Sequence, residues 1–98
     1  MQERSRESAS IEQFIRDRQV VLIERAIATL TVAADDELGF QFHRLVGSLG
    51  SYQLHEASRL LRELELRAEA PSASTPDALR SHAVSGLKAI AAAMEAAA

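Results

Sequence analysis

The chain has 98 residues, 47% hydrophobic and 26% charged, which is enough for one small domain with a single core. Its net charge of −3, with arginines scattered among glutamates, excludes a strongly basic nucleic-acid-binding surface, and the absence of cysteine excludes disulfides, thiolate metal sites and cysteine nucleophiles. Aromatic residues are only 4%, so the core must be aliphatic, which favours helices over a β-sandwich or barrel.

Residues 1–10 are polar, and we expect a flexible N-terminal segment there. Ser10 and Gln13 form the S-x-x-Q pattern of a capping box, which predicts that a helix starts at this point. This first helix should cover about residues 11–33, a stretch without glycine or proline. Its inner stripe is predicted to contain Phe14, Ile15, Leu22, Ala26, Ile27 and Leu30. Val20, Val21 and Ile23 widen the stripe, so an uncovered part of it would be available as a homodimer contact.

A second helix is expected over about residues 36–50, capped by Asp35 and Asp36. Its core stripe has apolar residues spaced four, three and four apart: Leu38, Phe42, Leu45 and Leu49. His43 lies beside this stripe, towards solvent, with Gly39 and Gly47 four residues before and after it. Positions four apart stack on one helix face, so the imidazole has no side chain above or below it. An interior glycine costs a helix about 1 kcal/mol relative to alanine, which indicates that something large must reach this ring.

The segment 50–52 predicts a break, followed by a third helix with apolar positions Leu54, Ala57, Leu61, Leu64 and Ala68. Residues 70–74 are expected to form a loop. Thr75 and Pro76 predict the start of a fourth helix, whose stripe is Leu79, Ala83, Leu87, Ile90 and Met94. Residues 96–98 are expected to fray. Because no strand pattern competes, the sequence predicts an all-α protein, an antiparallel up-down four-helix bundle over residues 11–95.

The second helix carries a recognisable motif, the segment His43-Arg44-Leu45-Val46-Gly47-Ser48-Leu49-Gly50-Ser51. It resembles the core motif of the histidine-containing phosphotransfer (HPt) domain, roughly H-x-L-K-G-S-x-G. The matching residues, in register and without a gap, are His43, Leu45, Gly47, Ser48 and Gly50. The segment 56–65 resembles the helix that usually follows, and the similarity extends over about residues 11–95.

This resemblance implies a phosphorelay carrier. His43 would accept a phosphoryl group from the phospho-aspartate of a response-regulator receiver domain, free or within a hybrid sensor kinase, and pass it on. The carrier would be no enzyme and would bind no cofactor, because the receiver supplies the aspartate, the Mg²⁺ and most of the catalysis. The surface that docks the receiver would consist of Gly39, Arg44, Val46, Gly47, Ser48 and Gly50.

The chemistry of the residues agrees with this role. A neutral imidazole is a competent nucleophile near neutral pH, and in-line phosphoryl transfer requires it to enter the partner's active site. We therefore expect His43 to project from a stiff helix, and the proposed role requires its ring nitrogens to lie neither in the hydrophobic interior nor against a neighbouring helix. Arg44 lies about 100° further round the helix, which suits steering of a partner better than contact with the phosphate. Lys88 is the only lysine, and its position relative to His43 is left open.

Two departures from the family pattern leave alternatives open. Val46 stands where the family has a lysine that helps to hold the phosphoryl group, and Gln53 stands where it commonly has a glycine at the helix junction. One alternative is a degenerate HPt-like domain that docks a receiver or dimerises without efficient transfer. Another is a helical dimerisation module whose glycines allow close packing.

Other sites and locations are not expected. His55 and His82 are interpreted as surface histidines, and a metal site formed by the three histidines is disfavoured because no pair has i, i+4 spacing. No apolar run approaches the ~20 residues needed to span a bilayer, and the polar N-terminus lacks the pattern of a signal peptide. We therefore expect a cytoplasmic protein with neither nucleic acid nor membrane as a partner.

Overall fold

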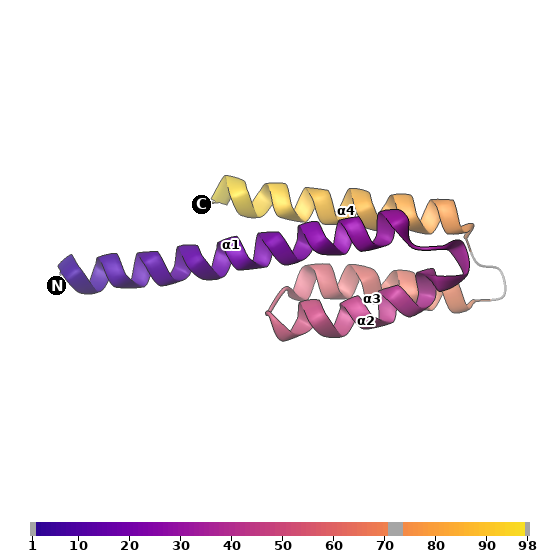
Figure 1. The fold of residues 1–98 in the computed structure, drawn as a ribbon, viewed down its shortest axis with the longest axis horizontal. Helices are drawn as coiled ribbons and strands as arrows, with labels where there is room; N and C mark the ends of the chain where they lie inside the picture. The colour runs from indigo at the N-terminus through magenta and orange to yellow at the C-terminus, as the bar shows by residue number, and fades with distance from the viewer. Residues whose placement is uncertain (1, 71–73, 98) are drawn as a thin grey trace.

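The computed structural model describes residues 2–70 and 74–97, and within them it contains helices and no strand. The elements, shown in Figure 1, are α1 (Gln2–Val32), the 3₁₀ helix η1 (Asp35–Glu37), α2 (Leu38–Ser51), α3 (His55–Glu69) and α4 (Pro76–Ala97). The prediction of an all-helical protein with four main helices is confirmed. The fourth helix also begins where the sequence indicated, at Pro76, whereas Leu54 precedes the third helix as its N-cap.

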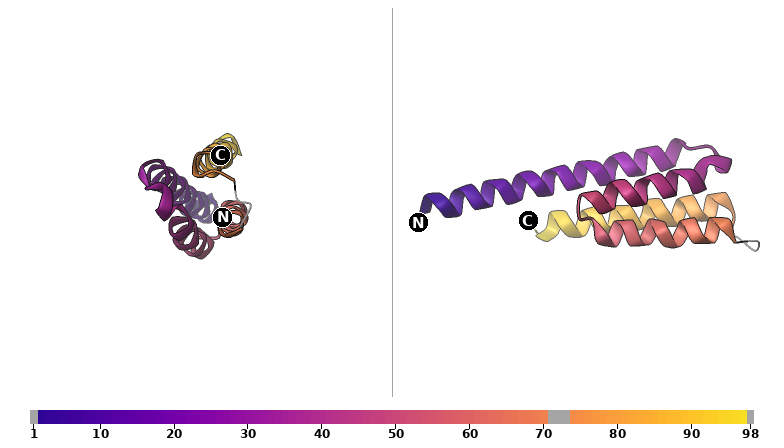
Figure 2. Two further views of the ribbon diagram at one scale, coloured as in Figure 1. Left: turned by 90° about the vertical axis from the view of Figure 1, so that its right-hand side faces the viewer. Right: turned by 90° about the horizontal axis from the view of Figure 1, so that it is seen from below.

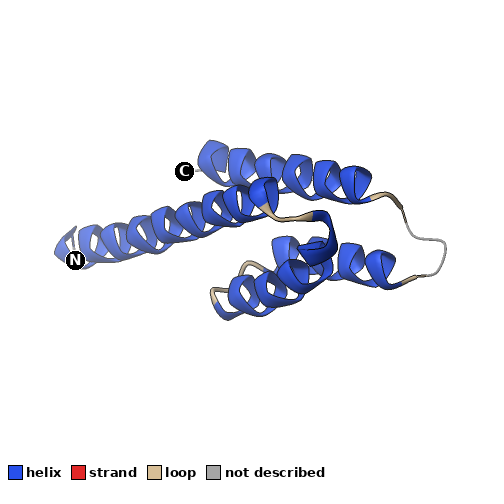
Figure 3. Ribbon diagram, turned by 45° about the vertical axis from the view of Figure 1, so that its right-hand side comes forward, coloured by secondary structure: helices blue, strands red, loops and turns tan. Residues whose placement is uncertain are grey.

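The four helices pack as neighbours around one core. α2 packs most extensively against α3, and α1 against α4, while contacts between α3 and α4 and between α1 and α2 close the ring. The end-on view in Figure 2 shows this arrangement. The turn between α2 and α3 lies at one end of the bundle, whereas η1 and the start of α4 lie at the other (Figure 3). The molecule is elongated, with extents of 58 × 20 × 18 Å.

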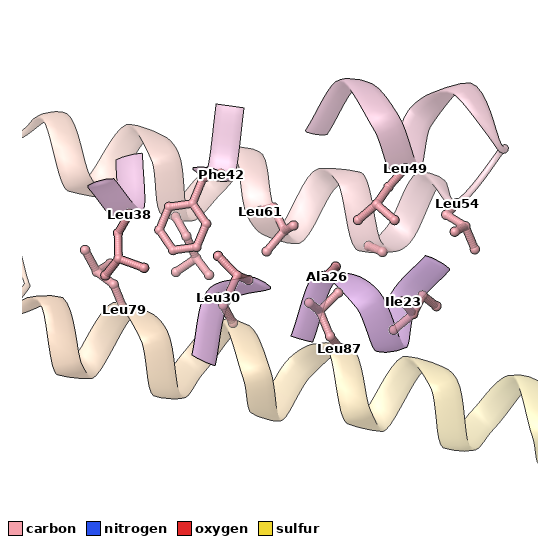
Figure 4. Packing of buried hydrophobic residues seen from close by; sticks show 13 residues of the cluster. Ile23, Ala26, Leu30, Leu38, Phe42, Leu49, Leu54, Leu61, Leu79 and Leu87 are labelled. Atoms are coloured by element: carbon pink, nitrogen blue, oxygen red, sulfur yellow. The ribbon is translucent and has the colours of Figure 1, made fainter. Parts of the chain in front are cut away.

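The core is formed by aliphatic side chains and one phenylalanine, as the composition predicted (Figure 4). No polar or charged residue is buried among those described. Leu38, Phe42 and Leu49 of the predicted α2 stripe are buried, and Leu45 is half-buried. The remaining core residues are Ile23, Ala26, Leu30, Leu54, Ala57, Leu61, Leu64, Leu79, Ala83 and Leu87.

The N-terminal part of α1 differs from the prediction. The helix begins at Gln2, so Ser10 lies inside it and does not cap it. Residues 2–10 contain good helix formers and neither glycine nor proline, so nothing in their sequence stops the helix. Phe14 and Ile15, predicted to face inwards, are 72% and 51% exposed. The reason is that α1 continues past the turn between α2 and α3, as Figures 1 and 2 show.

The start of α2 also differs from the prediction. Asp35 and Asp36 belong to η1, and neither η1 nor α2 has a side-chain cap. Asp35 instead accepts a hydrogen bond from Nη2 of Arg80 at 2.6 Å. Nη1 of Arg80 donates to the carbonyl oxygens of Leu30 at 2.6 Å and Ala33 at 2.7 Å. Arg80 therefore satisfies carbonyls at the end of α1 and fixes the connection that leads into α2.

The start of α4 follows the sequence signal. Oγ1 of Thr75 accepts a hydrogen bond from the backbone N–H of Ala78 at 3.2 Å, and Pro76 is the first helical residue. Further along α4, Gly86 faces Leu60 of α3 so closely that a Cβ atom built at Gly86 would lie 2.5 Å from a leucine methyl carbon. This glycine therefore allows α3 and α4 to approach each other.

Candidate functional site

The candidate site is built around His43, on the surface of α2. Its side chain is 76% exposed, and it follows Phe42, which is fully buried in the core. The backbone beneath the imidazole is therefore anchored by the packing of the next side chain. The structure places His43 beside the core stripe and towards solvent, where the helical spacing predicted it.

The imidazole has one partner, on the neighbouring helix. Nδ1 of His43 lies 3.2 Å from both carboxylate oxygens of Glu65 on α3, whose side chain is only 14% exposed. A carboxylate accepts hydrogen bonds and cannot donate them, so Nδ1 carries the proton and donates it. No hydrogen bond or ion pair to Nε2 occurs within residues 2–70 and 74–97. The neutral ring therefore presents the lone pair of Nε2.

This contact corrects one expectation. The sequence predicted a ring away from the neighbouring helices, and for Nδ1 that is wrong, because α3 supplies its hydrogen-bond acceptor. The alignment of α2 and α3 in the structure explains this contact. Gly39 lies opposite Ala68 and Gly50 lies opposite Ser58. Moving along α2 towards the turn therefore corresponds to moving along α3 towards the same turn, to lower residue numbers. Counting between these pairs brings Glu65 opposite His43.

The three glycines near His43 differ in what surrounds them. A Cβ atom at Gly47 would meet nothing within 4 Å, whereas at Gly39 it would lie 4.0 Å from Ala68 and at Gly50 3.5 Å from Ser58. All of these are open space or ordinary van der Waals contacts, and no described glycine has a positive φ. The fold therefore does not require a glycine at position 47. An exposed stretch of bare backbone remains one turn from His43.

The other residues of the predicted docking surface are placed less uniformly. Arg44 and Ser48 are exposed, and the guanidinium of Arg44 lies over the ring of Phe40, 5.9 Å from its centroid. Phe40, which the sequence analysis did not single out, is 62% exposed and forms a cation–π pair beside His43. Val46 is half-buried, and its carbonyl oxygen accepts a hydrogen bond from Ser58 Oγ at 2.9 Å.

The remaining candidates lie elsewhere. Lys88 is exposed on α4, which packs chiefly against α1 and α3, so the structure does not bring it to His43. His55 and His82 are exposed on α3 and α4. Within the described ranges, no group of three or more histidine, aspartate and glutamate side chains is arranged to hold a metal ion.

The surface around His43 is open. Neither His43 nor Glu65 lines any of the three surface hollows described in the structure, although Gly39 lines one of them. The site consists of an exposed imidazole, a carboxylate in contact with its Nδ1 and open backbone at Gly47.

Comparisons complete the description of the chain. No helix in residues 2–70 and 74–97 has both the length and the apolar character needed to cross a membrane. Comparison with known protein families, with curated proteins and with solved structures found no match. The function must therefore be inferred from the chemistry of His43 and its neighbours.

Proposed function

We propose that this chain is a histidine phosphotransfer carrier of the HPt type, an antiparallel up-down bundle that acts in a phosphorelay. Nε2 of His43 exchanges a phosphoryl group with the aspartate of a response-regulator receiver domain, which brings its own Mg²⁺. The observation that carries the proposal is the presentation of His43: an exposed ring on an anchored helix, with Nδ1 held by Glu65. The motif that resembles the HPt family gives this nucleophile its proposed substrate.

The contact between His43 and Glu65 has a clear role in such a transfer. The Nε2 lone pair attacks the phosphorus of the phospho-aspartate, the bond from phosphorus to the aspartate oxygen breaks, and the aspartate leaves as a carboxylate. The imidazole, which keeps its Nδ1 proton, gains positive charge as the new N–P bond forms. A carboxylate 3.2 Å from Nδ1 stabilises that charge and fixes the ring orientation. Glu65 is therefore proposed as a positioning residue that acts through His43.

The surface around the ring suits the approach of a second protein. Gly47 leaves the backbone bare one turn after His43, on a part of α2 that nothing else in the described chain covers. Phe40 and Arg44 add an exposed aromatic ring and a cation beside it. Exposed aromatic and arginine side chains are enriched in protein interfaces. These residues would contact the receiver while its aspartate meets Nε2.

The presence of valine at position 46, where the family has a lysine, favours the alternative. In this alternative the chain is a degenerate domain that docks a receiver without efficient transfer. An apolar residue at this position provides no charge for the phosphoryl group, and Lys88 on α4 does not replace it. This alternative shares the docking surface with the main proposal and differs only in the chemical step. Binding and labelling must therefore be measured separately.

The test is incubation of the chain with phosphorylated receiver domains of its source organism in the presence of Mg²⁺. We expect an acid-labile, base-stable label that is lost in His43→Gln and kept in His82→Gln, a matched change of an exposed histidine. A label that persists in His43→Gln, or no label from any receiver, would contradict the proposal. Binding of a receiver without label would support the degenerate domain.

Gly47→Leu extends the test to the docking surface. Because a side chain at position 47 meets open space, we expect this variant to fold with nearly unchanged helix content and to lose transfer. Self-association that survives His43→Gln but fails in Gly47→Leu, without receiver binding, would instead indicate a helical dimerisation module.

A further inference from the structure

A second surface lies on the side of α1 that faces away from the bundle. Seven positions spaced alternately three and four residues apart are all exposed, and we call them the α1 outer stripe: Ile11, Phe14, Arg18, Val21, Arg25, Ala28 and Val32. Phe14 is 72% exposed and Val32 83%. A repeat of 3.5 residues with mostly apolar side chains is the pattern of a coiled-coil seam. The core uses other residues of α1, so the bundle leaves this seam without a partner.

The N-terminal part of α1 also lacks cover from α2 and α3. The first core residue of α1 is Ile23, and the helix extends beyond the turn between α2 and α3 (Figures 1 and 2). Ile11, Phe14 and Ile15 are therefore exposed on a helix that projects from the bundle. A single helix in water is only marginally stable, and amphipathic helices obtain most of their stability by packing. A partner helix would supply that packing.

We infer that the occupant of the α1 outer stripe is a second copy of this chain, with the two α1 helices antiparallel about a two-fold axis. A parallel pair would bring Arg18 and Arg25 against the same residues of the second copy, and these like charges repel. An antiparallel pair centred near residues 19 and 20 avoids this. It sets Arg18 against the partner's Val21, and Arg25 against the partner's Phe14.

In this register the two α1 surfaces would be complementary in shape and in charge. The aliphatic stems of the arginines would cover apolar side chains, and Arg25 would lie over the aromatic ring of the partner's Phe14. The acids Asp17 and Glu24 are exposed and each precedes an arginine of the stripe by one position. Arg18 would face the partner's Glu24, and Arg25 the partner's Asp17. Each contact is repeated by the two-fold axis, as an isologous interface requires.

The size of the surface is sufficient for a modest dimer. The apolar side chains of the stripe together with Ile15 expose on the order of 500 Å² per copy, so pairing would bury about 1,000 Å², near the lower limit for a specific interface. The projecting part of each α1 would cover the stripe on the bundled part of the other. His43 and Glu65 lie on α2 and α3, so the His43 imidazole stays open in both copies of the chain. The dimer does not depend on the proposed phosphotransfer.

The first test measures the molar mass of the full chain in solution by sedimentation equilibrium. At about 100 µM, an interface of this size should hold the chain as a dimer. We expect Phe14→Glu to weaken dimerisation at least tenfold. Because Phe14 is outside the core, helix content and melting temperature should match those of the wild type when both are measured at a dilution where the wild type is also monomeric. The matched control is Leu66→Glu, an exposed leucine on α3, which should leave the dimer intact. A monomeric wild-type chain, or equal loss of dimer in both variants, would overturn the inference.

The second test determines whether the two α1 helices of the dimer are antiparallel or parallel. The chain has no cysteine, so Glu12→Cys, an exposed position beside the stripe, takes a single spin label. From a rise of 1.5 Å per residue, the antiparallel register separates the two labels by about 25 Å, whereas parallel helices bring them within about 15 Å. A short distance would overturn the antiparallel arrangement.

Discussion

At the scale of single residues, the functional interpretation depends on how Glu65 holds His43. Its carboxylate is mostly covered, and both oxygens lie 3.2 Å from Nδ1 of the imidazole. This contact selects the tautomer whose Nε2 lone pair is available. In the proposed transfer, the same carboxylate would stabilise positive charge on the ring.

Glu65→Gln should therefore slow phosphotransfer without disturbing the fold. Glutamine keeps the size and one acceptor oxygen but loses the negative charge, so we expect the single-turnover rate from a phosphorylated receiver to fall about tenfold. Glu63→Gln, an exposed change on the same helix, is the control and should keep the wild-type rate. Equal rates for all three proteins would show that Glu65 has no part in the reaction.

Val46→Lys tests whether the missing cation matters. A lysine one turn from His43 can pair with the phosphoryl oxygens, so we expect the half-life of the phosphorylated form to lengthen about threefold, as one exposed ion pair allows. The half-life is measured by loss of label after the receiver is removed. Ser48→Lys adds the same charge at an exposed position of α2 and should change the decay less. Identical decay in wild type and Val46→Lys would mean that this departure from the family motif has no consequence.

At the scale of helices, the two glycines Gly47 and Gly86 have opposite relations to their surroundings. Gly47→Ala adds a methyl group in open space and removes flexibility from α2, so the free energy of unfolding should rise by about 1 kcal/mol. At Gly86 a Cβ atom would lie 2.5 Å from a methyl carbon of Leu60, so the leucine side chain must move and Gly86→Ala should stabilise the protein less than Gly47→Ala does. Urea denaturation measures both. Greater stabilisation by Gly86→Ala than by Gly47→Ala, or destabilisation by Gly47→Ala, would contradict this description of the packing.

The turn between α2 and α3 contains a residue in a strained conformation. Gln53 has a φ of 62°, in the left-handed region that favours glycine. The backbone N–H of Leu54 donates to the carbonyl oxygen of Leu49 at 3.0 Å, and that of Gln53 donates to Gly50 at 3.1 Å. These two bonds form a Schellman motif, in which the position of Gln53 is usually glycine. The absence of glycine here therefore affects the stability of the turn and leaves its hydrogen bonds in place.

Gln53→Gly should raise the free energy of unfolding by about 0.5 to 1 kcal/mol, because relief of the left-handed strain exceeds the added flexibility of the unfolded chain. The midpoint in urea is the measurement, and a lower midpoint would contradict the strain assigned to Gln53. Gln41→Gly, which removes a side chain from within α2 without a positive φ, should be destabilising and serves as the comparison.

Much of each helix could be predicted from its own sequence. The apolar stripes of α2, α3 and α4 became the core, and Thr75 and Pro76 marked the start of α4, because these signals are local. Asp35 was predicted to be a helix cap, yet it accepts a hydrogen bond from Arg80, 45 residues later. A contact between distant elements has no local pattern, so it could not be predicted in this way.

At the scale of the whole molecule, the same limit applies to α1 and to the site. Phe14 has the right spacing for an inner stripe, but helix lengths decide whether another helix lies opposite it, and α1 extends past the others. The spacing around His43 predicted an exposed ring, whereas its contact with Glu65 depends on how α2 and α3 are aligned. The candidate nucleophile could thus be found from sequence, but the carboxylate that holds it could not.

The most direct measurement of the central claim is ¹⁵N NMR of the histidine side chains after transfer from a phosphorylated receiver. The contact with Glu65 predicts one phosphorylated imidazole, that of His43, with phosphorus on Nε2 and the proton kept on Nδ1. Phosphorus on Nδ1, or on His55 or His82 in place of His43, would contradict the account.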